Sequence, residues 1–185
     1  MKKLSIFCLS LVLIVVFSTS CKKIVNKIFS GTDVGVPTIE VTIPAIPPLA
    51  LSFGELPLGS FNQRFNLDSA VRANTAGAFG ASVVTSVKIK TITINIPNGD
   101  DNNNLSNFES ARVMISSQNN TTPVVFASLT FPTTSTNTFT SSPTEGTELL
   151  PYLKDGELTY KIFGKARKST SKPLTMVVTV IARVK

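Results

Sequence analysis

The chain has 185 residues, and none of them is histidine or tryptophan. Histidine is the commonest general base and metal ligand, so its absence excludes serine–histidine triads, cysteine–histidine dyads and imidazole-bound zinc. Cysteine is nearly absent too, because only Cys8 and Cys21 occur. The body of the chain therefore forms no intrachain disulfide, no CxxC redox pair and no cysteine-based zinc site. These absences predict a protein without a cofactor and favour a role other than catalysis.

Residues 1–20 have the three regions of a secretory signal. A basic start is followed by a run of fourteen mainly apolar residues, 4–17 (LSIFCLSLVLIVVF), and then by small residues. A bilayer-spanning helix needs about 20 apolar residues, which favours an export signal over a membrane span. At Cys21 the segment resembles the lipobox of bacterial lipoprotein precursors, although Ser18 stands where that pattern favours leucine. A plain signal peptide and an uncleaved amino-terminal anchor are the alternatives.

The resemblance implies that Cys21 becomes the first residue of the mature protein and carries two or three acyl chains, palmitate among them. Lys22 follows the cysteine where an aspartate would retain such a protein in the inner membrane, so the resemblance implies the outer membrane. The expected partner is thus the membrane, through the lipid on Cys21. Without Lys2 and Lys3, 16 basic residues face 11 acidic ones, a charge of +5. Export argues against nucleic acid as the partner of this basic chain.

Three segments are predicted: a signal peptide over 1–20, a lipid-anchored flexible tether over 21–37, and a folded domain over 38–185. Prolines rule out helix in the first part of the domain. Beyond it, apolar residues alternate with period two and predict strands. The expected strands cover residues 38–43, 60–67, 83–96, 111–115, 125–131, 158–162 and 174–184. Seven or eight strands predict an all-β antiparallel sandwich of immunoglobulin-like or related architecture. One short helix over 68–73, capped by Asp68, and one turn within 148–153 complete it.

The predicted strand 83–96 contains a change of phase. Val87 and Ile89 are apolar at odd positions, whereas Ile92, Ile94 and Ile96 are apolar at even ones. A one-residue slip would send half of these side chains to the wrong face. We therefore expect a β-bulge or bend between Lys90 and Ile92, with a strand buried on both sides at its middle as the alternative.

Residues 98–104 (NGDDNNN) gather oxygen atoms of the kind that calcium binds, and Asp100 and Asp101 are the candidate ligands. The spacing lacks the alternate positions and the closing glutamate of an EF-hand. The competing interpretation is a polar hairpin turn with Asn-Gly at its centre.

Five basic residues cluster near the carboxyl end: Lys161, Lys165, Arg167, Lys168 and Lys172. They are interpreted either as a patch for an anionic ligand such as a phosphate, headgroup or glycan, or as the solvent face of an edge strand and its following turn. Residues 68–70 (DSA) resemble a short bacterial O-glycosylation acceptor, which makes Ser69 a candidate site. The Ser/Thr-rich stretch Thr130–Thr147 is expected to be either an exposed, glycan-bearing loop or a long connection whose Phe139 packs down.

The leading hypothesis is a lipid-anchored envelope protein whose β-sandwich is a binding or structural module for other envelope proteins or glycans. An alternative is an accessory subunit that assembles with envelope or surface-fibre proteins by strand pairing, through its long terminal strand and proline-rich first segment. The third hypothesis is a carboxylate-dependent hydrolase, whose sign would be two carboxylates converging in a cleft.

Overall fold

The computed structural model describes residues 29–143 and 146–185, and within them the period-two segments form eight strands in two antiparallel sheets. The strands are β1 (Thr32–Ile43), β2 (Leu56–Arg64), β3 (Val87–Asn95), β4 (Phe108–Ser117), β5 (Val124–Thr130), β6 (Thr138–Ser141), β7 (Glu157–Ala166) and β8 (Leu174–Val184). The helical elements are α2 (Leu67–Ala73), α3 (Leu150–Leu153) and the 3₁₀ turns η1 (Pro48–Ser52), η2 (Ala81–Val83) and η3 (Leu105–Asn107). The predicted all-β sandwich is confirmed.

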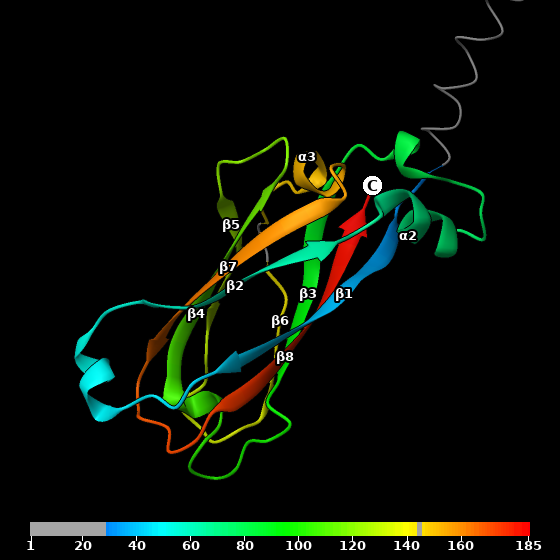
Figure 1. Ribbon diagram of the computed structural model, residues 1–185. Coiled ribbons are helices and arrows are strands. Elements are labelled where there is room, and N and C mark those ends of the chain that lie inside the picture. Colours follow the sequence, from blue (N-terminus) through cyan, green and yellow to red (C-terminus); the bar gives the residue numbers. More distant parts are fainter. Residues whose placement is uncertain (1–28, 144–145) are drawn as a thin grey trace, which may run out of the picture.

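The strand order is that of a jelly roll. One sheet has the order β1-β8-β3-β6 and the other β2-β7-β4-β5. The pairs β1·β8, β2·β7, β3·β6 and β4·β5 are all antiparallel neighbours, as if one long hairpin had been wrapped into two layers. Eight strands in two Greek keys make a jelly roll, whereas an immunoglobulin constant-type domain has seven strands in sheets of four and three. The protein therefore has one of the related sandwich architectures (Figure 1).

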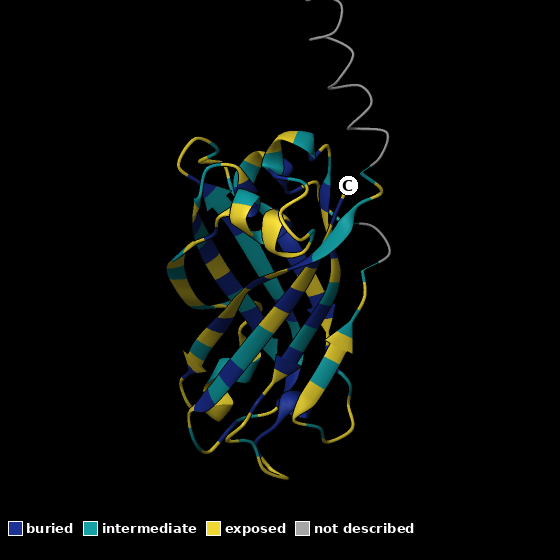
Figure 2. Cartoon of the chain, turned by 90° about the vertical axis from the view of Figure 1, so that its right-hand side faces the viewer, coloured by how far each residue is buried: buried dark blue, intermediate teal, exposed yellow. Residues whose placement is uncertain are grey.

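Side chains that alternate along each strand fill the space between the sheets. In β7, for example, Leu158, Tyr160 and Ile162 are buried while the residues between them lie outward. Figure 2 shows this alternation as stripes of buried and exposed residues along the strands. Tyr160 packs against Phe61 and Phe126, with ring centroids 5.1 and 5.5 Å away. Its hydroxyl has no hydrogen-bond partner in the described part of the chain, and burial raises its pKa.

The first strand corrects the predicted tether. β1 begins at Thr32 rather than at residue 38, so residues 32–37 belong to the sandwich and lie beside the end of β8. Pro37 lies where the ladder shifts register, between Val36 and Ile39. An edge strand tolerates a proline at such an irregularity because no ladder hydrogen bond needs its missing N–H. The prediction that the tether extends to residue 37 was therefore wrong.

The predicted bulge in β3 is confirmed, one residue earlier than expected. Against β8, the register shifts between Ile89 and Thr91, which leaves Lys90 as the extra residue. Ile89 is buried before the shift, and Ile92 and Ile94 are buried after it. The bulge thus brings both apolar phases of the strand onto the core side.

The terminal strand β8 lies in the middle of its sheet, between β1 and β3. β7 is interior as well, between β2 and β4, so the interpretation of its lysines as protection for an edge strand was wrong. Exposed Lys161 lies between buried residues along β7, and such an alternate position faces outward from the sheet rather than along an edge.

Both predicted helical segments exist, but the cap of α2 differs. The side chain of Asn66 accepts a hydrogen bond from the backbone N–H of Ser69 at 2.9 Å, so Asn66 rather than Asp68 is the N-cap. Asp68 instead forms an ion pair with Arg72 at 2.6 Å, four residues later in the helix.

Strand β6 was not predicted, because it lies inside the Ser/Thr-rich stretch. It pairs with the end of β3, and Phe139 within it packs onto the core. The Phe139 ring lies 5.7 Å from the Phe131 ring, centroid to centroid. The expectation that Phe139 packs down is confirmed.

Candidate functional site

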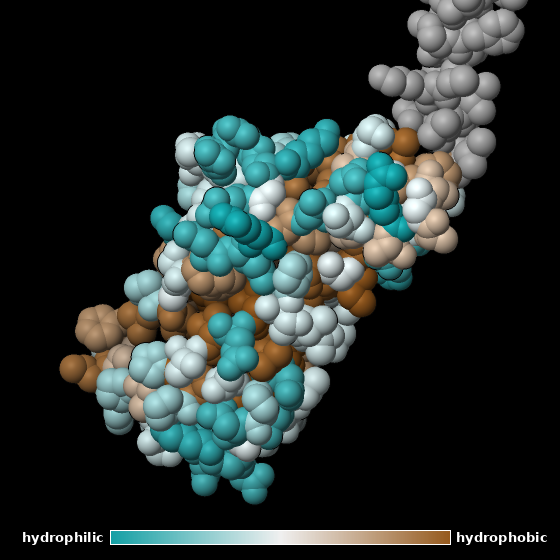
Figure 3. Space-filling model, turned by 45° about the vertical axis from the view of Figure 1, so that its right-hand side comes forward, coloured by the Kyte–Doolittle hydropathy of each residue, from teal (hydrophilic) through white to brown (hydrophobic). Residues whose placement is uncertain are grey.

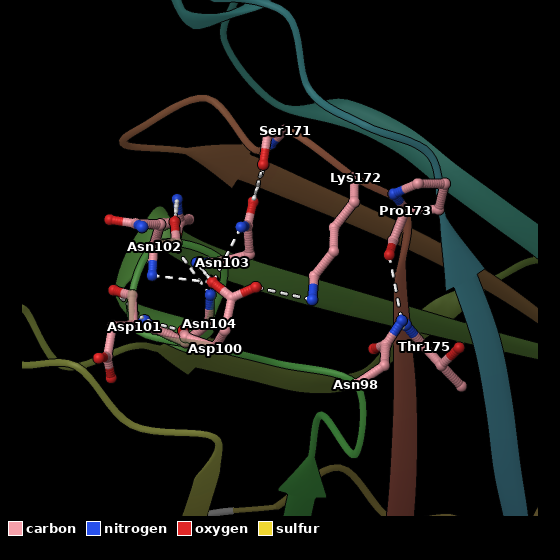
Figure 4. Close-up of polar contacts among 11 residues, drawn as sticks. Asn98, Asp100, Asp101, Asn102, Asn103, Asn104, Ser171, Lys172, Pro173 and Thr175 are labelled. Carbon is pink, nitrogen blue, oxygen red and sulfur yellow. Dashed lines mark hydrogen bonds and ion pairs between the residues drawn. The ribbon is translucent and has the colours of Figure 1, made fainter.

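Three loops meet at the end of the sandwich where β3 ends and β8 begins. They cover residues 96–107, 131–137 and 167–173. The first of them contains the Asn-Gly and Asp-Asp pairs, and it joins β3 of one sheet to β4 of the other. It is therefore a crossing between the two sheets, and the predicted hairpin was wrong. Figure 4 shows its polar side chains beside the β7–β8 loop.

Buried asparagines hold this end together, and Asn104 makes the most contacts. Its side-chain amide donates hydrogen bonds to the carbonyl oxygens of Asp100 and Asp101, at 2.9 and 3.0 Å, and to the hydroxyl of Ser135, at 2.9 Å. Its side-chain oxygen accepts from the backbone N–H of Ser106 at 2.9 Å. The group is thus fully satisfied, as a buried amide must be to avoid a desolvation penalty.

Two further asparagines connect the same loop to the β7–β8 loop. The side-chain oxygen of Asn103 accepts from the backbone N–H of Ser171 at 2.8 Å, and the Asn107 amide donates to the carbonyl of Ser169 at 2.8 Å. Both asparagines are buried. These hydrogen bonds join the β3–β4, β5–β6 and β7–β8 loops into one polar cluster.

Asp100 belongs to this cluster. Its Oδ1 accepts hydrogen bonds from the backbone N–H groups of Asn102 and Asn103, and its Oδ2 lies 2.7 Å from Nζ of Lys172. Lys172, with Asn103, holds the pKa of this carboxyl below its usual range. The Asp101 carboxylate points away from that of Asp100 (Figure 4). Over residues 29–143 and 146–185, no three acidic or sulfur-bearing side chains come together for a metal ion. Asp100 thus has structural contacts, and the calcium hypothesis gains no support from the geometry.

The predicted basic patch is partly engaged by the protein itself. Lys165 pairs with Glu109 at 2.9 Å, Lys172 pairs with Asp100, and the Arg167 guanidinium donates to the backbone carbonyls of residues 106, 131 and 132. Lys161 and Lys168 are exposed, and neither forms an ion pair with another described residue. Two of the five cations are therefore open to an external anion.

A cavity of about 450 Å³ lies at the opposite end, between the end of β2 and the start of β7. Arg64 and Lys154 line it together with the buried side chains of Phe65, Leu67 and Leu153. The sequence did not reveal it, because its lining comes from segments far apart in the chain. Its lining has one carboxylate, where a glycosidase needs two.

Several acidic groups are held by hydrogen bonds or ion pairs within the fold. The pKa is lowered for Asp33 by a hydrogen bond from Lys90, for Glu55 by one from Arg112, and for Asp155 by one from Ser117. A general acid at neutral pH needs the opposite, a raised carboxyl pKa. These groups therefore favour stabilisation of the fold over catalysis.

Two candidates from the sequence remain, Ser69 and Cys21. Ser69 is exposed on the first turn of α2. Cys21, the predicted lipidation site, lies outside the described residues, as does Cys8. Within the part of the chain that the structure describes, we find no helix with the length and apolar character needed to span a bilayer.

No family model matches the chain, and no curated protein matches it in sequence. Among solved structures, the Drosophila NLP-core, a histone-binding pentamer by its description, is 11% identical and covers 79% of this chain and 98% of its own, with a TM-score of 0.28. VP2 of the infectious bursal disease virus subviral particle is 10% identical over 84% of this chain and 32% of its own, with a TM-score of 0.38. The decameric BFDV capsid protein is 11% identical over 84% of this chain and 98% of its own, with a TM-score of 0.31. Scores this low support no statement about function.

Proposed function

We propose that this protein is a lipid-anchored component of the bacterial cell envelope, held in the outer membrane by acyl chains on Cys21, and that its β-sandwich is a binding or structural module. The observation that carries the proposal is the position of Cys21. It is one of two cysteines in the chain, and it stands where the export signal ends. Transfer of a diacylglyceryl group to sulfur requires a thiol, which is the stronger nucleophile in its thiolate form.

The start of the sandwich agrees with an anchor at this position. Phe29 already packs against Phe79, with ring centroids 5.2 Å apart, and β1 follows at Thr32. Seven residues, 22–28, separate Cys21 from Phe29. At about 3.3 Å per extended residue they reach roughly 25 Å. A lipid on Cys21 would therefore keep the folded domain close to the bilayer surface.

A binding or structural role fits the chemistry of the described residues better than a hydrolase does. The pKa values of four carboxyl groups with protein partners are lowered, those of Asp33, Glu55, Asp68 and Asp155. The cavity beside Arg64 contains a single carboxylate, Asp68. Assembly by exchange of the terminal strand has less support. β8 pairs on both sides, with β1 and with β3, so its release would break two ladders at once.

Metabolic labelling tests the anchor directly. The full chain is produced in a bacterial host that matures lipoproteins and is supplied with labelled palmitate. We expect label in the wild type and in Cys8→Ser, whose cysteine leaves with the signal, and none in Cys21→Ser. Intact mass should show a chain that begins at residue 21 and carries acyl groups. Label that persists in Cys21→Ser, or a chain that retains residues 1–20, would refute the proposal.

A further inference from the structure

The connection between β1 and β2 forms an apolar tip on the molecule. Residues 44–54 (PAIPPLALSFG) are eleven consecutive residues without a charge. They contain η1, and within it Leu49 is 73% exposed, while Phe53 just after it is 54% exposed. The other exposed large apolar side chains of the described residues, Val125 and Ile181, are each 39% exposed. Figure 1 shows the turn projecting from one end of the sandwich, and Figure 3 shows the same corner of the molecule as hydrophobic.

Two hydrogen bonds to the β7–β8 loop fix the start of the tip. The backbone N–H of Ile46 donates to the Thr170 hydroxyl at 2.9 Å, and the Thr170 backbone N–H donates to the Ile46 carbonyl at 3.0 Å. Ile46 and Thr170 are both buried. Behind the tip lies an apolar cavity of about 160 Å³, lined by residues 43–47, by Phe108 and by the start of β2. Leu49 and Phe53 are thus exposed on a supported turn.

The same hydrogen bonds join the start of the tip to a loop that carries positive charge. Thr170 belongs to the β7–β8 loop, which carries Lys168 two residues earlier. Lys168 is exposed and forms no ion pair with another described residue. The nearest acidic residue along the chain, Glu55, is already paired with Arg112. Exposed apolar side chains on a turn that is joined to a loop with an exposed cation suit a surface that is apolar inside and anionic at its boundary.

We propose that this tip, residues 44–54 together with Lys168, docks on an anionic lipid bilayer. Leu49 and Phe53 enter the boundary between headgroups and acyl chains, and Lys168 contacts the headgroups. The contact is distinct from any lipid on Cys21, because β1 runs the length of the sandwich between Thr32 and the tip (Figure 1). It therefore does not depend on the proposed acylation.

The absence of tryptophan from the chain provides a local probe of the tip. In Phe53→Trp the new indole is the only one in the chain. Its emission therefore reports the surroundings of the tip alone, even if another segment also binds the vesicle. Ile181→Trp is the matched control, since Ile181 is 39% exposed on β8. Leu49→Trp is a second probe, in case Phe53→Trp disturbs the fold, which circular dichroism would show.

The full chain is reconstituted with vesicles of phosphatidylcholine and phosphatidylglycerol, or of phosphatidylcholine alone. We expect the emission at position 53 to shift to shorter wavelength on the anionic vesicles only, and the emission at position 181 to stay unchanged. In the Phe53→Trp chain, Leu49→Ser should lower the ratio of inserted to free tip about tenfold, and Lys168→Ala about fivefold. Raised salt should weaken the contact as Lys168→Ala does.

An unshifted emission at position 53 on anionic vesicles would overturn the proposal. So would an equal shift on neutral vesicles, because the headgroup charge would then have no part. A shift that grows with protein concentration in the absence of vesicles would overturn it too, and would assign the tip to contact between copies of this chain.

Discussion

The side chain of Asn104 stabilises the loop end of the sandwich, and its replacement by alanine tests the polar cluster. Asn104→Ala removes an amide whose two N–H protons are shared among three acceptors, and an oxygen that accepts one bond. It leaves the buried N–H of Ser106 without its side-chain acceptor, and the carbonyls of Asp100 and Asp101 without that donor. The β3–β4 loop, which crosses between the sheets, then loses the side-chain hydrogen bonds that fix its conformation.

The magnitude follows from the loss of these contacts. Each intramolecular hydrogen bond contributes about 0.5 to 1.5 kcal/mol, and a buried group left unsatisfied costs about 1 to 3 kcal/mol. Because the loop relaxes and water enters, we expect a loss of about 3 to 4 kcal/mol in the free energy of unfolding. For a domain of this size, 1 kcal/mol corresponds to about 2 to 4 °C, so the melting temperature should fall by about 10 °C.

Urea and thermal unfolding of the purified chain, followed by circular dichroism, measure this loss. Asn102→Ala is the matched control, because Asn102 is exposed and contributes only backbone groups to the contacts described. It should lower the free energy of unfolding by less than about 0.5 kcal/mol. A loss below about 1 kcal/mol in Asn104→Ala, or one equal to that of Asn102→Ala, would refute the structural role of the cluster.

Two further predictions concern the bulge and the effect of pH. Deletion of Lys90 should be tolerated, with a melting temperature within a few degrees of the wild type, because it brings residues 87–96 into one phase without a bulge. Deletion of Thr93, which reverses the face of Ile94, should prevent stable folding; equal losses in both variants would contradict the role given to Lys90. Asp155→Asn should be less stable than the wild type at pH 7, because Ser117 and the neighbouring Asn119 lower the pKa of Asp155 in the folded state. That difference should shrink as the pH falls from about 5 to 2, because the stability from a lowered carboxyl pKa is fully present above the unfolded value of about 3.9 and is lost as the pH falls through the folded value. A difference that stays constant with pH in urea unfolding would contradict it.

Local patterns were enough to predict much of the fold. Alternation along β8 and β7 identified both strands, and the phase change around Lys90 identified the bulge. Each of these is a statement about side chains a few residues apart, which a strand's period of two fixes directly. β6 was missed because its Ser and Thr residues carry no such alternation, and the packing of its one large apolar side chain, Phe139, depends on Phe131 in the loop after β5.

The candidate sites were harder to predict for the same reason. Asp100 and Asp101 looked like calcium ligands because their neighbours in space were unknown; one of those neighbours is Lys172, 72 residues later, which holds Asp100 in an ion pair. The uncharged run 44–54 was visible, but it indicated only a segment without helix. Its exposed apolar side chains, and its hydrogen bonds to the loop that carries Lys168, became apparent in the folded chain.

The sequence by itself determined the properties that depend on residue types and short spacings: the absence of histidine chemistry, the predicted export segment with its cysteine, and the sandwich class. Only the tertiary structure decided the jelly-roll order, the interior place of β7, the start of the sandwich at Thr32 and the partners of each charge. These properties depend on contacts between residues far apart in the chain. Such contacts form when two sheets bury their alternate faces against each other, and no local pattern records which strand will lie beside which.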